Sequence, residues 1–256
     1  MFFDYNELKK ELIGTKIRKP LSGTLSGHAA GEPFDKHVYE LIKSKLPSIT
    51  FRQYEYLNKI LLDNLAKTTV EEREQLIENN SVRMLIRRGK DATRSWSKTN
   101  QFEEKQDDTA DILVTDNAFF DIIDIKTKDI NKKSQPPNII SSFKLANLMT
   151  ELIDNDEYDT LDITYIEIEW ALEGDFLVCK NVYTASLFKE NPKDLYINWA
   201  AAMQIQFHVS KLKQEYTGNM KEWAVEYIKA FIEQATGRAE TMIEKFVTPF
   251  KKYIEE

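Results

Sequence analysis

The chain has 256 residues, of which 42% are hydrophobic, 11% aromatic and 30% charged, with a net charge of −7. Such a chain is long enough for one or two domains with a substantial core, and its aromatic content excludes extensive disorder. A single cysteine excludes an internal disulfide framework, and the absence of a long apolar run or a secretory leader pattern predicts a cytoplasmic protein with no membrane partner.

Hydrophobic periodicity in the first part of the chain predicts helices. They are expected at Tyr5–Ile13, Glu32–Leu46, Tyr54–Leu65 and Val70–Arg88. Pro33 suits the first turn of the second helix, where its missing N–H costs nothing.

After Thr109 the pattern changes to short β-branched and aromatic segments, which predict strands. These strands are expected at Ala110–Thr115, Phe119–Thr127, Ile163–Leu172, Phe176–Tyr183 and Met203–Val209, with helices at Ile139–Ile153 and Lys221–Tyr253. Helices around a mostly antiparallel sheet predict an α+β (mixed α/β) fold. We expect residues 1–256 to form one domain with helical N- and C-terminal elaborations.

Charge is unevenly distributed along the chain. Residues 83–98 contain six bases and one acid, residues 126–133 contain four lysines and one acid, and acids are concentrated at 154–162 and 167–175. A basic run often forms only a solvated helix face. Because the local field depends on where charges lie, the net acidity still leaves a nucleic-acid partner open.

The segment with the clearest chemistry is the hairpin predicted around Asp116-Asn117. Side chains alternate along a strand, so Asp124 and Lys126 share a face whose beginning is apolar. A tight hairpin can bring Asp111 beside Asp124, so two carboxylates and a lysine converge. A surface hairpin with a cross-strand charge pair would leave the same pattern.

Such a trio suits phosphodiester hydrolysis with a divalent metal. Mg²⁺ prefers oxygen ligands, and Asp111, Asp124 and a backbone carbonyl, assigned to Ile125, would form a partial shell. The metal can polarise the phosphodiester and lower the pKa of a bound water, while Lys126 helps to position or deprotonate that water. Asp-x-Lys with a carboxylate on the hairpin partner is the minimal pattern of PD-(D/E)xK nucleases.

Longer blocks of sequence carry a more specific resemblance. They are Ser22–Phe34, Phe102–Gln106, Asp108–Leu113, Pro137–Ser141, Leu195–His208 and Phe250–Ile254. These blocks resemble the HincII/HindII type II restriction endonucleases. The resemblance implies a PD-(D/E)xK fold, a homodimer and Mg²⁺-dependent cleavage of both strands of double-stranded DNA at a palindrome, GTYRAC, to blunt 5′-phosphate ends. A host would also need a cognate DNA methyltransferase, which is not expected to be a stable subunit.

By this resemblance, Asp111 and Asp124 correspond to the metal-binding carboxylates and Lys126 to the catalytic lysine. Ala110 stands where the general motif has proline, as it does in the resembling enzymes. Glu32 occupies the place of a helix-borne acid that lies near the metal in many nucleases of the superfamily. Its alternative role is to complement the positive end of a helix dipole.

The resemblance also places DNA contacts in two segments. Gln135 corresponds to a residue that wedges into DNA, and Asn138 to one among the base contacts. Asn138 could instead cap the following helix. Pro136 stands where the resembling enzymes have alanine, which stiffens the loop and puts the exact site in question. Tyr196 and Asn198 resemble a second recognition segment, for which the alternative is a packed core turn.

Two other functions remain open on sequence grounds. One is a PD-(D/E)xK repair or recombination nuclease that selects DNA structure instead of sequence. The other is a catalytically inactive DNA-binding protein on the same fold, against which the complete set of Asp111, Asp124 and Lys126 argues.

Overall fold

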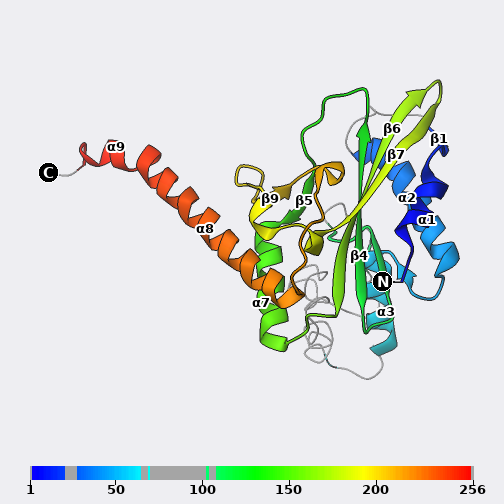
Figure 1. Ribbon diagram of the computed structural model, residues 1–256, viewed down its shortest axis with the longest axis horizontal. Coiled ribbons are helices and arrows are strands. Elements are labelled where there is room, and N and C mark those ends of the chain that lie inside the picture. Colours follow the sequence, from blue (N-terminus) through cyan, green and yellow to red (C-terminus); the bar gives the residue numbers. More distant parts are fainter. Residues whose placement is uncertain (1, 21–27, 65–68, 70–101, 104–107, 255–256) are drawn as a thin grey trace.

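The computed structural model describes residues 2–20, 28–64, 69, 102–103 and 108–254. A six-stranded mixed sheet lies at its centre with helices on both faces, and a three-stranded sheet packs beside it (Figure 1). The α+β class predicted from the sequence is therefore confirmed. In the part of the chain that the structure describes, no helix has the length and apolar character needed to cross a membrane.

The larger sheet has the strand order β1-β7-β6-β4-β3-β2. Its strands are β1 (Lys16–Arg18), β2 (Thr50–Phe51), β3 (Ile112–Thr115), β4 (Phe120–Asp129), β6 (Leu161–Glu173) and β7 (Phe176–Ser186). Neighbouring strands are antiparallel except β4 and β6, which run parallel over the whole of β4. A parallel pair needs a crossover connection, and the segment containing β5 and α7 provides it.

The smaller sheet has the order β5-β9-β8 and comes from two distant parts of the chain. It consists of β5 (Asn138–Ser141), β8 (Ile197–Asn198) and β9 (Gln204–Gln206), all paired antiparallel. The loop that leaves β4 leads directly into β5, so the smaller sheet is tethered to the end of β4.

The helices divide between the two faces of the larger sheet. They are α1 (Tyr5–Leu12), α2 (His28–Lys45), α3 (Gln53–Asn64), α7 (Ser142–Asn155), α8 (Met220–Phe246) and α9 (Thr248–Lys251), with short 3-10 turns at Leu187–Lys189, Pro192–Asp194 and Val209–Lys211. Helices α1 and α2 cover one face with an apolar cluster around Leu8, Phe34 and Ile123. Helices α3, α7 and α8 pack on the other face.

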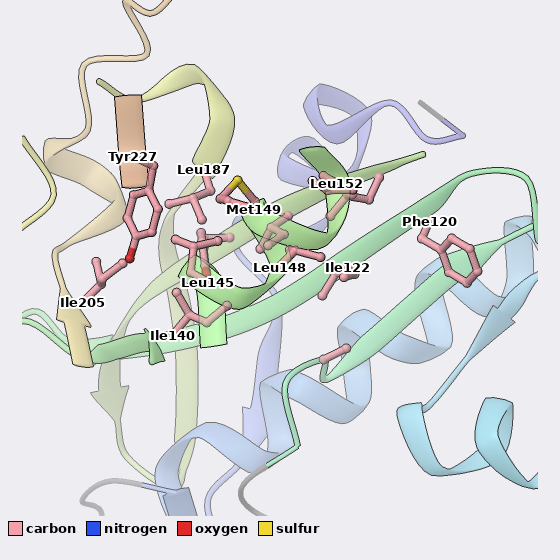
Figure 2. Close-up of a cluster of buried hydrophobic side chains, with 14 of the residues drawn as sticks. Phe120, Ile122, Ile140, Leu145, Leu148, Met149, Leu152, Leu187, Ile205 and Tyr227 are labelled. Atoms are coloured by element: carbon pink, nitrogen blue, oxygen red, sulfur yellow. The ribbon is translucent and has the colours of Figure 1, made fainter. Parts of the chain in front are cut away.

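The second apolar cluster anchors the face that carries the candidate site. Figure 2 shows Phe120 and Ile122 of β4 together with α7 residues such as Leu145 and Met149, and Ile205 links the smaller sheet to them. Burying a leucine- or phenylalanine-sized side chain contributes about 1.5–3 kcal/mol. The apolar base of β4 therefore holds the strand firmly while its second half approaches the surface.

Several predicted boundaries are wrong for local reasons. Helix α2 begins at His28, so Pro33 lies inside it and not in the first turn. The predicted helix at Ile139 begins only at Ser142, because Ser141 caps it by accepting a hydrogen bond from the Lys144 N–H. The predicted strand to Val209 ends at Gln206.

The long C-terminal helix also differs from its prediction. It breaks at Val247, where α8 gives way to the short α9. Pro249 lies just beyond the break and can neither donate a backbone hydrogen bond nor fit against the carbonyl four residues earlier. The predicted helix at Val70–Arg88 lies outside the described residues.

Candidate active site

The β3–β4 hairpin positions Asp111 and Asp124 next to each other. Ile112 pairs with Ile123 across the hairpin, and the Asp111 N–H donates to the Ile123 carbonyl at 3.0 Å. The connecting turn places Asn117 at a φ of 72°, a conformation that asparagine tolerates well. The register predicted from strand alternation therefore puts both carboxylates on one face of the sheet.

Asp124 and Lys126 form a close ion pair on this face. The Lys126 Nζ lies 2.7 Å from Oδ2 and 2.9 Å from Oδ1 of Asp124. The Asp111 carboxylate accepts a 2.6 Å hydrogen bond from the Ile125 N–H. The first six residues of β4 are buried and the last four are half-buried, so the charged groups lie where the strand leaves the core.

Burial and the neighbouring Asp124 carboxylate raise the pKa of Asp111 to about 7. Lys126 and the Ile125 N–H oppose this change but do not cancel it. Burial also works against the charged form of Lys126, yet Asp124 and Asp111 outweigh it and raise the pKa of the lysine. The site thus concentrates negative charge that a cation would neutralise, next to an ammonium group that stays protonated at neutral pH.

The donors at this site are chemically suited to Mg²⁺. Asp111 and Asp124 present carboxylate oxygens. In a strand the N–H and C=O of one residue lie on the same side, so the Ile125 carbonyl lies on the Asp111 side of β4. Among the described residues, no group of three or more His, Cys, Asp or Glu side chains could hold a metal. Two carboxylates still suffice for Mg²⁺, which keeps several waters.

Two buried residues at the junction of β2 and α3 hold the backbone that carries Asp111. The Arg52 guanidinium donates to the Asp111 carbonyl at 3.0 Å and to Asp35 of α2 at 2.8 Å. The Gln53 side-chain carbonyl accepts from the backbone N–H groups of residues 109 and 110, both at 2.9 Å. Arg52 and Gln53 were not predicted from the sequence, because no motif or periodicity distinguishes an anchoring Arg-Gln pair at a helix start.

Glu32 comes from α2 and not from the β3–β4 hairpin. It belongs to α2, which packs on the face of the sheet that carries Ile123 and Ile125, opposite to Asp124 and Lys126. Its carboxylate forms an ion pair with Lys36 at 2.6 Å, and both side chains are largely exposed. This ion pair lies within α2 and leaves the expected role of Glu32 near the metal as a prediction.

The proposed DNA-contacting residues gather on the smaller sheet. Asn138 opens β5, Asn198 ends β8, and a single glutamine between them, Gln206, hydrogen-bonds to both. Tyr196 precedes β8 with its side chain 62% exposed, and Gln135 is exposed in the loop before β5. Asn138 is not a helix cap, so that alternative is wrong. Gln206 was not predicted from the sequence.

Besides Lys126, two lysines of the run at 126–133 form ion pairs with acids, which the charge pattern of the sequence does not show. Because β6 lies beside β4, Lys128 pairs with Glu169 at 2.9 Å. Lys132 lies 3.5 Å from Asp129, three residues earlier in the chain. Glu169 is thus remote from the lysine run in sequence but adjacent to it in space. The basic run at 83–98 lies outside the described residues.

Comparison with known proteins gives a consistent result. A family model described as "Restriction endonuclease HincII" matches residues 8–254. The type II restriction enzymes HindII, from Haemophilus influenzae strain Rd, and HincII, from Haemophilus influenzae, are each 52% identical over 250 residues, covering 98% of this chain and 97% of theirs. Among solved structures, the NlaIV restriction endonuclease covers 78% of this chain and 89% of its own at 11% identity, with a TM-score of 0.27, too low to bear on the fold.

Proposed function

Because this chain belongs to the HincII family of type II restriction endonucleases, we propose that it hydrolyses both strands of a short palindromic DNA site. Asp111, Asp124 and Lys126 would form the catalytic site for this reaction. The observation that carries the proposal is the convergence of these three side chains at the end of a buried hairpin. The family resemblance suggests GTYRAC as the site, with a blunt cut that leaves 5′-phosphate and 3′-hydroxyl ends.

Asp111, Asp124 and the Ile125 carbonyl are the groups that would hold Mg²⁺. When bound, the ion polarises the scissile phosphate and lowers the pKa of a coordinated water. Asp111 must lose its proton to act as a ligand, and its raised pKa makes that loss the step most sensitive to pH. Arg52 keeps the Asp111 backbone fixed so that its carboxylate faces Asp124.

Lys126 supplies a fixed positive charge beside the reacting phosphate. Its ammonium group forms an ion pair with Asp124. An ammonium donor in this place stabilises the negative charge that develops on the phosphate and orients the attacking water. Its raised pKa favours these roles over that of a general base at neutral pH.

The smaller sheet provides the proposed recognition surface. Asn138 and Asn198 carry amides that can read base edges, while Gln135 and Tyr196 are exposed in the segments that lead into β5 and β8. Since β5 follows the catalytic strand after one loop, contacts to bases would fix the position of the phosphate at Asp124. Pro136 in that loop makes GTYRAC an expectation to be tested.

We further propose that the protein acts as a homodimer, since a palindrome presents the same half-site twice. The inner part of α8 buries Trp223 and Tyr227, whereas its outer part projects away from the body (Figure 1). Eight apolar side chains there are at least 40% exposed: Ile232, Met242, Ile243, Phe246, Val247, Phe250, Tyr253 and Ile254. In a standard interface each partner buries about 800 Å², and a run of exposed apolar side chains of this kind offers a surface for such contact.

The charges of this projecting segment favour a second copy of the chain over DNA. Residues 232–256 carry five acids (Glu233, Glu240, Glu244, Glu255 and Glu256) and four bases (Arg238, Lys245, Lys251 and Lys252), so the segment has no net positive charge to attract a polyanion. Sedimentation velocity should find a wild-type dimer and a monomeric Phe246→Glu/Phe250→Glu variant. A wild-type monomer at micromolar concentration, or a variant that remains dimeric, would contradict the proposed interface.

In the cell, an enzyme of this kind needs its own chromosome protected. We therefore propose a cytoplasmic enzyme whose host carries a cognate DNA methyltransferase, without a stable complex between the two proteins. Host DNA that this enzyme cuts as readily as unmethylated DNA would contradict that expectation.

Variants at the trio test the assignment of roles. Asp124→Asn and Lys126→Met should each reduce Mg²⁺-dependent cleavage of plasmid DNA by at least 100-fold, in line with the loss of a metal ligand or a charge-stabilising group (about 10²–10³-fold). Asp129→Asn, on the same strand but the opposite face, should cleave like the wild type. If either trio variant cleaves normally, the assigned roles are wrong.

A further inference from the structure

Three amide side chains on the smaller sheet form a continuous relay. The Asn198 NH₂ group donates to the Gln206 side-chain carbonyl at 2.9 Å, and the Gln206 NH₂ group donates to the Asn138 side-chain carbonyl at 2.7 Å. Asn138 and Gln206 are direct partners in the β5–β9 pairing. The two proposed recognition residues are therefore connected through Gln206.

The backbone fixes the direction of this relay. The N–H groups of Ala200 and Ala201 donate to the Asn198 side-chain carbonyl at 3.1 and 3.2 Å. That carbonyl must therefore face the turn, which leaves the Asn198 NH₂ for Gln206. Gln206 must then turn its own carbonyl toward Asn198 and its NH₂ toward Asn138. Each amide in the chain has one orientation that satisfies its partners.

The turn that begins this relay has an uncommon backbone. Ala202 and Met203 have φ values of 51° and 57°, in a region where glycine or asparagine is usual. Both residues are exposed, so burial of their side chains does not explain the conformation. Backbone strain of this kind is concentrated at functional segments. Here the two strained residues close the turn whose N–H groups orient Asn198.

We propose that Gln206 is a specificity-determining positioning residue, which locks Asn138 so that its NH₂ group faces the DNA as a hydrogen-bond donor. The inference rests on the proposed function. Asn138 is exposed, and among the described contacts none uses its NH₂ group. The partners of this NH₂ group would be acceptor atoms on a base edge, such as N7 of a purine, O6 of guanine or O4 of thymine.

Two substitutions at Gln206 separate orientation from simple stability. Gln206→Met removes both hydrogen bonds and lets the Asn138 amide rotate. Gln206→Glu can still accept from Asn198 but presents an oxygen to Asn138, which must turn its NH₂ inward and its carbonyl toward the DNA. Asn138→Asp in the wild-type background also presents an oxygen outward, so it should have the same base preference as Gln206→Glu.

The test is cleavage of a duplex library with randomised central base pairs, read by sequencing the cut ends in Mg²⁺. Gln206→Met should reduce discrimination by about 5- to 150-fold at one symmetric pair of positions, the range for loss of one specific base contact. Asn138→Ala should relax the same positions, and the double variant should relax them no further. Gln204→Met, two positions before Gln206 on β9 and outside the relay, should retain the wild-type preference.

The outcomes distinguish this inference from the proposed function. A wild-type protein that cuts no preferred sequence overturns both. A wild-type protein with one site, together with a Gln206→Met variant of unchanged preference, overturns only the role of Gln206. That role is also overturned if Gln206→Met and Asn138→Ala relax different positions, or if Gln204→Met relaxes them as strongly as Gln206→Met.

Discussion

Replacing Asp111 by asparagine should stabilise the metal-free protein while abolishing its response to Mg²⁺. The Asp111 carboxyl is buried and faces Asp124, which raises its pKa from 3.8 to about 7. An asparagine side chain can keep the hydrogen bond from the Ile125 N–H through its carbonyl and donate to Asp124 through its NH₂. The variant therefore removes the charge repulsion without leaving a backbone group unsatisfied.

The magnitude follows from the linkage between protonation and folding. Because the folded-state pKa lies above the unfolded one, this group's stabilising contribution is fully present below pH 4 and is lost as pH rises through about 7. The shift corresponds to about 4 kcal/mol of stability lost by pH 8, at 1.36 kcal/mol per pKa unit. Asp111→Asn does not titrate, so its advantage over the wild type should grow between pH 4 and pH 7 toward that limit.

Urea unfolding in EDTA at pH 4.5, 6 and 8 measures this advantage directly. Adding Mg²⁺ at 100 times its dissociation constant should stabilise the wild type by about 2.7 kcal/mol and leave Asp111→Asn unchanged. Asp116→Asn is the matched control on the same hairpin, because backbone N–H groups of residues 119 and 118 lower the pKa of Asp116 and reverse the sign. An Asp111→Asn variant that is less stable than the wild type at pH 8, or equally favoured at all pH values, would show that burial of the Asp111 charge and its repulsion from Asp124 do not govern this site.

Three further variants probe the surroundings of the site. Arg52→Met, which removes the ion pair with the largely buried Asp35, should lose about 3–5 kcal/mol in urea unfolding and reduce cleavage even where the protein is folded. Asp121→Asn should flatten the pH dependence of stability between pH 4 and 6 by about 3 kcal/mol, because burial raises the pKa of Asp121 to about 6; an unchanged slope would contradict this. Glu32→Gln should bind Mg²⁺ with wild-type affinity in calorimetry. A tenfold loss of Mg²⁺ affinity would show that Glu32 contributes to the metal site.

The sequence located the hairpin chemistry because strand alternation has a strict period of two. Once Phe119–Thr127 is read as a strand, Asp124 and Lys126 must share a face, and a short turn fixes Asp111 opposite. The apolar residues of the same strand also identified which end enters the core. All three of these features are local, and the structure has each of them.

Features that depend on distant segments could not be predicted in this way. Arg52 reaches the Asp111 carbonyl from 59 positions away, and Gln206 meets Asn138 across 68 positions. The stretch from Asn138 to Ser141 reads as a helix start, yet pairing with β9 makes it a strand. In each case tertiary contact overrides local preference, and a single sequence holds no record of that contact.

Cleavage of DNA at one palindromic sequence, with a metal held by Asp111 and Asp124, is the activity proposed for this chain. Sequencing the ends of a complete Mg²⁺ digest of one bacterial genome would establish or overturn it. We expect all ends to fall at a single short palindrome, in blunt pairs with 5′-phosphates, and Asp124→Asn to produce none. Ends scattered without a common sequence, or confined to branched or nicked DNA, would contradict the proposed activity.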